Sequence, residues 1–176
     1  MDTSQAERQI AARVYAALDA LGITYEKLEH PPVFTADQAA AHWASLPGTP
    51  VKNLFLRNKR GDRHYLVILG IEKEADLRQL VKVIGDDRLS FGSPERLMAR
   101  LGLLPGAVSP FGLINDETQV MRVIIDQDLK RSERLIFHPN INTASVSIAF
   151  DDFQRFLASR RNEVRFVNVV AEKGGP

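Results

Sequence analysis

The sequence contains no cysteine, and this absence excludes several kinds of chemistry. A chain without thiols has no disulfide framework, no thiolate nucleophile and no cysteine-ligated zinc or iron–sulfur site. Histidine occurs four times, never at the His-x-x-x-His spacing of a helical zinc site. Neither a Gly-x-Ser-x-Gly elbow nor a Gly-rich phosphate loop is present. We therefore expect no bound metal and no cofactor.

An excess of one charge and long apolar runs are also missing. Lys and Arg total 23 against 22 Asp and Glu, so a nucleic-acid partner must be held by local basic patches. No apolar run approaches the roughly 20 residues that span a bilayer, and the N-terminal MDTSQAERQIAARVY is charged and amphipathic rather than a signal peptide. We expect a cytoplasmic protein with no membrane partner. Its 176 residues, 44% hydrophobic, suit one domain with one core.

Periodicity and capping signals predict the order of the elements. Helices are expected at 4–21, 35–46, 77–84, 93–101 and 151–157, with Asp151 capping the last one. Strands are expected at 24–29, 51–57, 63–69, 120–125, 135–137, 143–148 and 164–170, and an irregular loop at 103–116. Strands and helices that are mixed without strict alternation predict an α/β fold with a mixed sheet wrapped by helices.

Lys52 and the histidines are the first candidates for chemistry. Lys52 shares a strand face with Leu54 and Leu56, where an ammonium is costly unless it finds a partner. A lysine at the first residue of a strand can instead extend to water, and spacing alone slightly favours that interpretation. Asn53, on the opposite face, is equally ambiguous. His42 and His64 are expected at the surface.

Two irregular stretches are also ambiguous. The segment 106–112, GAVSPFG, carries two glycines that allow close backbone approach to a ligand and a proline that stiffens the path. Its N–H groups can bind a carbonyl oxygen or a developing oxyanion, although composition favours an ordinary rigid connection. In 134–146, RLIFHPNINTASV, a strand breaks at His138-Pro139-Asn140. This corner is either a plain turn or part of a cavity wall.

Three separated motifs resemble one family. VKNLFLRN (51–58), the Gly-x-x-x-Pro pattern of 106–110 with its continuation SPFGLIND (109–116), and FHPN-x-NTAS (137–145) are similar to the prolyl-tRNA synthetase associated, or YbaK-like, editing domains. The similarity is greatest to the free-standing ProX branch. It runs from the first helix to the last strand and implies a single α/β domain with a curved mixed sheet at 1–171, followed by a flexible tail at 172–176.

The resemblance implies an activity and partners. Members hydrolyse the ester that joins a wrong amino acid to tRNA, and the ProX branch removes alanine from tRNA for proline, Ala-tRNA(Pro), in trans. Water attacks with help from the terminal ribose hydroxyl, so no protein nucleophile is required. Mischarged tRNA is the expected partner, prolyl-tRNA synthetase a further candidate, and a homodimer the expected assembly. The alternatives are removal of cysteine or serine, or a non-catalytic module of the same fold that binds aminoacyl-tRNA or a synthetase.

The same resemblance assigns residues. Lys52 is expected to anchor the 3′ end of the tRNA, Gly106 to lie in the loop that approaches the aminoacyl group, and His138 to position substrate or exclude wrong side chains rather than act as a base. These three are the candidate catalytic residues. The candidate substrate-binding residues are Asn53, Ser109, Pro110, Gly112 and Asn140. Basic residues available for phosphate contacts, each also explained as an ordinary solvated charge, are Lys59, Arg60, Arg63, Arg131 and Arg134.

Overall fold

The structure is a computed structural model that describes residues 3–170, so the predicted tail at 172–176 lies outside the described residues. The helices are α1 (Thr3–Ala20), α2 (Ala36–Trp43), α3 (Leu77–Ile84), α4 (Pro94–Leu101) and α5 (Phe150–Arg160), with two short 3-10 helices, η1 (Pro110–Asn115) and η2 (Gln127–Arg131). The strands are β1 (Tyr25–Glu29), β2 (Thr49–Asn58), β3 (His64–Gly70), β4 (Leu89–Phe91), β5 (Met121–Asp126), β6 (Arg134–Phe137), β7 (Ala144–Ala149) and β8 (Val164–Val167).

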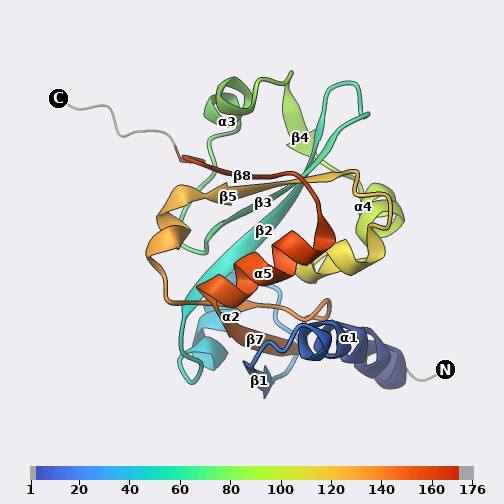
Figure 1. Ribbon diagram of the computed structural model, residues 1–176, viewed down its shortest axis with the longest axis vertical. Coiled ribbons are helices and arrows are strands. Elements are labelled where there is room, and N and C mark those ends of the chain that lie inside the picture. Colours follow the sequence, from blue (N-terminus) through green and yellow to red (C-terminus); the bar gives the residue numbers. More distant parts are fainter. Residues whose placement is uncertain (1–2, 171–176) are drawn as a thin grey trace.

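The strands form one mixed sheet in which β2 joins two halves. Their order is β1-β7-β6-β2-β3-β5-β8, and β4 pairs with the outer end of β2. The strand β2 is parallel to β6 only at Thr49 and Pro50, and from Val51 to Arg57 it is antiparallel to β3. In Figure 1, β2 accordingly runs from the half that contains β7 to the half that contains β3, β5 and β8. The predicted single-domain α/β fold with a mixed sheet is confirmed.

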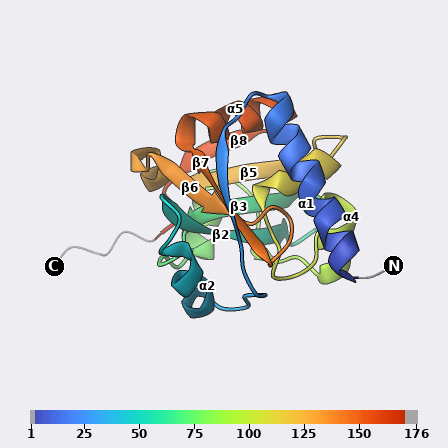
Figure 2. The same cartoon turned by 90° about the horizontal axis from the view of Figure 1, so that it is seen from below.

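Helices cover both faces of the sheet. The largest apolar cluster packs Leu18 of α1, Leu101 of α4 and Phe153 of α5 against the strands, whereas a second cluster on the other face includes Leu80 of α3. Helix α2 belongs to neither cluster. It packs through Trp43 and a few neighbours against the end of β6, apart from α1 and α5 (Figure 2). The α2 segment is therefore a separate cover over the junction of the two halves.

Capping residues explain where most helices begin and end. The Thr35 side chain accepts the N–H of Gln38 in the first turn of α2, and Gly85 ends α3 in the left-handed conformation, as predicted. The prediction for Asp151 is wrong. Helix α5 begins at Phe150 after Ala149, which makes no side-chain cap, and Asp151 lies within the first turn. Its carboxylate there complements the positive end of the helix dipole instead.

Short elements account for the other differences. The strand β4 and the helix η2 were not predicted, and the expected loop at 103–116 contains η1. These three short elements carry too little periodicity to be recognised in sequence. The last strand ends at Val167 rather than at 170. None of these differences changes the fold class.

Candidate active site

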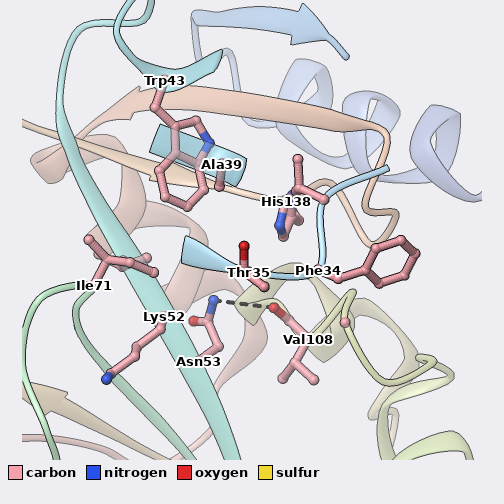
Figure 3. A pocket seen from close by; sticks show the side chains of 12 residues that line it. Phe34, Thr35, Ala39, Trp43, Lys52, Asn53, Ile71, Val108 and His138 are labelled. Atoms are coloured by element: carbon pink, nitrogen blue, oxygen red, sulfur yellow. Dashed lines mark hydrogen bonds between the residues drawn. The ribbon is translucent and has the colours of Figure 1, made fainter. Parts of the chain in front are cut away.

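A cavity of about 220 Å³ opens where β2 and β6 separate. The two strands are paired at Thr49 and Pro50, and then β6 ends while β2 continues toward β3. Parallel strands that separate at a carboxyl end leave a crevice there, which is where open α/β sheets bind ligands. Residues from β2, α2 and four connecting segments form its walls (Figure 3). They are Val33, Phe34, Thr35, Ala39, Trp43, Val51, Lys52, Asn53, Ile71, Gly106, Val108 and His138.

Asn53 presents an unused hydrogen-bond acceptor at this cavity. Its Nδ2 donates to the carbonyl oxygen of Val108 at 3.2 Å, whereas its Oδ1 is buried without a partner. A carbonyl oxygen only accepts, so the Val108 contact fixes which end of the amide is nitrogen. A buried unpaired acceptor costs about 1–3 kcal/mol. Because Asn53 is a residue of the cavity wall, a water or a ligand that brings an N–H or O–H donor can complete this acceptor.

His138 offers a second acceptor. Its Nδ1 lies 2.9 Å from the carbonyl oxygen of Ala144, so Nδ1 carries the proton and donates, and Nε2 keeps its lone pair. Burial lowers the pKa of His138, the neighbouring His30 lowers it further, and the Ala144 carbonyl opposes both. The ring is therefore neutral near neutral pH, and Nε2 can accept a hydrogen bond from water or substrate. Its role as positioner or base stays a prediction.

A buried network holds the cavity wall behind His138 in place. The Trp43 Nε1–H donates to Ser145 Oγ at 2.9 Å, and Ser145 Oγ lies 2.8 Å from His30 Nε2. His30 Nδ1 donates to the Pro31 carbonyl at 2.9 Å, so the serine hydroxyl donates to Nε2. This chain joins α2 to β7 across the sheet junction. The shape of the cavity is consequently fixed by residues far apart in the sequence.

Lys52 lies on the opposite side of the cavity from His138 (Figure 3). It is not the first residue of its strand, because β2 begins at Thr49. Its ammonium is 3.3 Å from Glu74, and the exposed fractions of the two side chains are 23% and 95%. An ion pair with so exposed a partner contributes little, typically about 0–1 kcal/mol. A phosphate can therefore displace Glu74 from Lys52 at small cost.

The loop after α4 supplies backbone donors. Gly106 lines the cavity with φ +86°, a conformation that requires glycine, and the nearest atom to an added Cβ is Asn142 Nδ2 at 3.9 Å. The Ala107 N–H donates to the Leu104 carbonyl. The N–H groups of Gly106 and Val108 have no hydrogen-bond partner within residues 3–170. They are the backbone donors that can bind an ester carbonyl or its oxyanion.

Four of the predicted site residues lie off the cavity wall. Ser109 is fully buried and its Oγ accepts an N–H at the start of η1, which Pro110 begins. A Cβ on Gly112 would come within 2.7 Å of Leu103, so this glycine permits close packing. Asn140 is buried at the corner after β6 with φ +64° and an unpartnered Oδ1. The structure thus shows these residues shaping the loop and corner, and their contact with substrate stays a prediction.

The α2 side of the cavity was not recognised in the sequence. Phe34, Thr35, Trp43 and Ile71 all line it. Two signals were available, namely a pair of prolines directly before a capping box, and the only tryptophan of the chain. Neither signal says that the segment faces a cavity, because the facing residues come from distant parts of the chain.

The remaining histidines serve packing. The expectation that His64 lies at the surface is wrong, because it is 2% exposed and its ring stacks on Phe55. His42 is half-buried and stacks on His30. Among residues 3–170, no three histidine, aspartate or glutamate side chains gather as a metal site requires. Within the same residues, no helix has the length and apolar character to cross a membrane.

Fold and site together define a class of protein. It is a single α/β domain with a small cavity whose lining residues include the acceptor-bearing side chains of Asn53 and His138 and the backbone N–H groups of Gly106 and Val108.

The chain belongs to the family of aminoacyl-tRNA editing domains, which its residues 30–156 match. It is 37% identical over 169 residues to the prolyl-tRNA editing protein ProX of Acetoanaerobium sticklandii, covering 96% of this chain and 99% of that protein. It is 26% identical over 146 residues to the multifunctional Ser/Thr-tRNA deacylase ProXp-y of Escherichia coli K12, covering 81% and 85%. A crystal structure of a candidate trans-editing enzyme for prolyl-tRNA synthetase shares the fold, with TM-score 0.69, 24% identity, and 90% and 96% of the two chains covered.

Proposed function

We propose that this protein is a trans-acting aminoacyl-tRNA deacylase that hydrolyses the ester of mischarged tRNA, with Ala-tRNA(Pro) as its substrate. Membership of the editing family and near full-length similarity to a prolyl-tRNA editing protein support this assignment. The structural observation that supports an aminoacyl ester as substrate is the unpartnered Oδ1 of Asn53, a residue of the cavity wall. An aminoacyl ester brings an ammonium group, the donor that this acceptor lacks.

The cavity supports hydrolysis by water. With the ammonium at Asn53, the ester carbonyl lies toward the free N–H groups of Gly106 and Val108, which stabilise the oxyanion that forms. Water attacks the carbonyl carbon, the bond to the ribose oxygen breaks, and that oxygen takes a proton, releasing free amino acid and uncharged tRNA. The terminal ribose hydroxyl assists the water, and His138 Nε2 accepts a hydrogen bond that holds water or substrate in position.

The small size of the cavity supports alanine as the amino acid removed. A synthetase pocket distinguishes a missing methylene by only about 1–3 kcal/mol, so smaller amino acids escape rejection. A second pocket that admits alanine and excludes proline supplies the discrimination. The volume of about 220 Å³ and the apolar side chains of Val51, Ile71 and Trp43 suit a methyl group.

The position of Lys52 supports a role in binding the 3′ end of the tRNA. Lys52 lines the cavity, and among residues 3–170 only the exposed Glu74 pairs with its ammonium. A phosphate of the terminal nucleotides that replaces Glu74 gains a charge-assisted hydrogen bond. Phosphate contacts of this kind hold the nucleic acid in register without reading its sequence.

The test is deacylation of tRNA for proline charged separately with alanine, cysteine, serine or proline. We expect the alanyl ester to be lost fastest and the prolyl ester to be spared. Serine is included because the Escherichia coli relative is a Ser/Thr-tRNA deacylase. No acceleration over buffer for any ester contradicts the proposal, and tight binding without turnover indicates a non-catalytic binding module.

The Lys52→Ala variant tests the residue assignment separately. We expect a loss of roughly 100-fold in kcat/KM, the scale for a lost charge-stabilising donor. Glu74→Gln is the matched control, because it removes the partner of Lys52 and leaves the ammonium in place. Full activity of Lys52→Ala would contradict the role of Lys52 while leaving the deacylase activity unaffected.

Assembly and localisation remain part of the proposal. We propose a homodimer in the cytoplasm that works alongside prolyl-tRNA synthetase. Sedimentation equilibrium of the purified protein tests the dimer, and co-purification with the synthetase in the presence and absence of charged tRNA tests the association. A monomer at all concentrations would contradict the first, and no enrichment of synthetase would contradict the second.

A further inference from the structure

Phe34 is a large apolar side chain that stands in water at the mouth of the cavity. It lines the cavity, yet 76% of it is exposed. Single exposed apolar residues are common and carry no information by themselves. The position of Phe34 is informative, because its ring does not pack into an apolar cluster of the protein.

The residue occupies a helix position that normally packs. It directly precedes the N-cap Thr35 of α2, where an apolar side chain often folds over the first turn onto the fourth helical residue. That residue is Ala39, which is buried with Trp43 in an apolar cluster that does not include Phe34. The ring therefore points outward and makes no hydrophobic staple.

The backbone that carries the ring is well anchored. The Phe34 N–H donates to Gln38 Oε1 at 2.9 Å, and Gln38 N–H donates to Thr35 Oγ1 at 3.2 Å. The preceding Val33 is buried, and its N–H donates to the Asn142 carbonyl. An aromatic ring presented on a fixed backbone loses little conformational freedom on binding, so it is suited to contact a ligand.

The size of the cavity indicates which part of the substrate meets the ring. Sites that enclose a whole small ligand have volumes of roughly 300–1,000 Å³. A cavity of about 220 Å³ holds an aminoacyl group and the edge of the ribose, but leaves the attached base outside. On the ribose of a nucleotide, the base and the 5′ phosphate project in different directions. Phe34 and Lys52 lie on different sides of the same cavity (Figure 3).

We propose that Phe34 is the platform on which the terminal adenine of the aminoacylated tRNA stacks while the ester lies in the cavity. The proposal rests on the proposed function, because it takes the substrate to be an aminoacyl ester of a terminal adenosine. Every base has an apolar face that stacks on an aromatic ring, and such stacking is a common means of holding single-stranded ends. Phe34 then positions the ester through the base, and Lys52 does so through the phosphate.

The test compares three substitutions with a distant control. We expect Phe34→Ala and Phe34→Leu to lose roughly 5- to 100-fold in kcat/KM for Ala-tRNA(Pro), mainly through KM, and Phe34→Trp to retain activity. Phe91→Ala is the control, since Phe91 is 65% exposed on β4, at the opposite end of the molecule from α2 (Figure 1). A Phe34→Leu variant with unchanged KM would overturn the proposal, because leucine keeps apolar contact but has no aromatic face.

A pair of small ester substrates, one with and one without the adenine, measures the contribution of the base. Wild-type protein should hydrolyse 2′(3′)-O-alanyl-adenosine faster than the alanyl ester of methyl riboside, which has no base, and Phe34→Ala should remove that preference. An equal loss on both esters would indicate a role in the fold and contradict stacking.

A binding measurement separates this proposal from the proposed function. If the wild-type protein hydrolyses no ester, binding of 3′-alanylamido-3′-deoxyadenosine is followed by the fluorescence of Trp43, the only tryptophan and part of the cavity wall. Weaker binding to Phe34→Leu than to wild type supports stacking without catalysis. Equal binding to both overturns the stacking proposal.

Discussion

Two asparagines on β2 are used in opposite ways. Asn58, at the outer end of the strand, is 1% exposed and both ends of its amide are bonded. Asn53, at the sheet junction, has a bonded Nδ2 and an Oδ1 with no partner. The same side chain thus closes a turn at one position and leaves an acceptor free in a cavity at the other. A buried polar group without a partner in the protein needs a water or a ligand to complete it.

Asn58 is an example of a side-chain amide whose oxygen and nitrogen are both hydrogen-bonded within the protein. Its Oδ1 accepts the backbone N–H groups of Gly61, Asp62 and Arg63, at 2.9, 3.2 and 3.1 Å. Its Nδ2 donates to Asp62 at 2.7 Å and to Asp86 at 3.4 Å. The side chain therefore supplies acceptors for the Asp62 and Arg63 N–H groups and adds one to the backbone bond of Gly61. Nothing in this arrangement is available to a ligand.

Two histidines repeat the contrast. His64, beside the outer end of β2, shares its Nε2 with Arg96 at 3.1 Å, and its ring stacks on Phe55. His138, at the cavity, uses Nδ1 on the Ala144 carbonyl, and its Nε2 has no partner within residues 3–170. Burial holds both rings neutral near neutral pH. The outer end of β2 is thus satisfied internally, whereas the junction end keeps acceptors that the protein does not pair.

The largest effect is expected on stability at the outer end of β2, where the polar groups are paired within the protein. Asn58→Ala removes the side-chain partner of the Asp62 and Arg63 N–H groups, one of the two partners of the Gly61 N–H, and one hydrogen bond from each of the Asp62 and Asp86 carboxylates. We expect the free energy of unfolding to fall by about 2–4 kcal/mol. For a chain of this length, each 1 kcal/mol lowers Tm by roughly 2–4 °C. Urea denaturation and a thermal melt measure this. The kcat/KM of the folded fraction should be unchanged, and an unaltered urea midpoint would break the comparison.

The second largest effect is expected on activity at the sheet junction, where Asn53 has an unpaired acceptor. Asn53→Ala removes the acceptor for the substrate ammonium, and we expect kcat/KM to fall roughly 10- to 100-fold, the scale of one hydrogen bond to a charged group. Its stability should change by less than about 1 kcal/mol, because only the bond to Val108 is lost. Asn58→Ala is the matched control. Full deacylation by Asn53→Ala would remove the basis for placing the ammonium there.

Residue patterns predicted the elements of this fold better than the site. Helix α3 carries its own periodicity and its own glycine stop, so it was predictable from a few neighbouring residues. The motif VKNLFLRN contains both asparagines in one strand. The partners of Asn58 lie mainly in the turn that follows it, at Gly61, Asp62 and Arg63, whereas the partner of Asn53 is Val108, far away in the chain. The burial of His64 was missed for the same reason, since Arg96 belongs to another element.

His138 provides a smaller effect that separates two roles. If it positions substrate or limits the cavity, His138→Ala should change the ratio of kcat/KM for alanyl and seryl esters by roughly 10-fold, the scale of a lost steric contact. If it were a general base, the rate on alanyl ester would fall while the ratio stayed constant. We expect the ratio to change. His138→Asn is the control, because its side-chain amide can still donate to the Ala144 carbonyl.

The smallest effect is a pH dependence of stability that comes from His64, beside the outer end of β2. Burial, assisted by Arg100, Arg96 and Arg57, lowers the pKa of His64 to about 4 from 6.5. Between these values the unfolded chain binds the proton and the folded chain does not, so stability is full above pH 6.5 and falls as pH drops toward 4.

His64→Gln tests this dependence, because a glutamine oxygen can still accept the Arg96 hydrogen bond but does not titrate. The decline of Tm between pH 6.5 and 4 should become shallower in this variant than in wild type. His138 contributes in the same direction, because its pKa is also lowered, so part of the decline should persist in His64→Gln. Combining His64→Gln with His138→Asn should flatten the curve further. Identical slopes for wild type and both variants would show that neither ring is buried in the neutral form, and the contrast between the two histidines would then rest on hydrogen bonding alone.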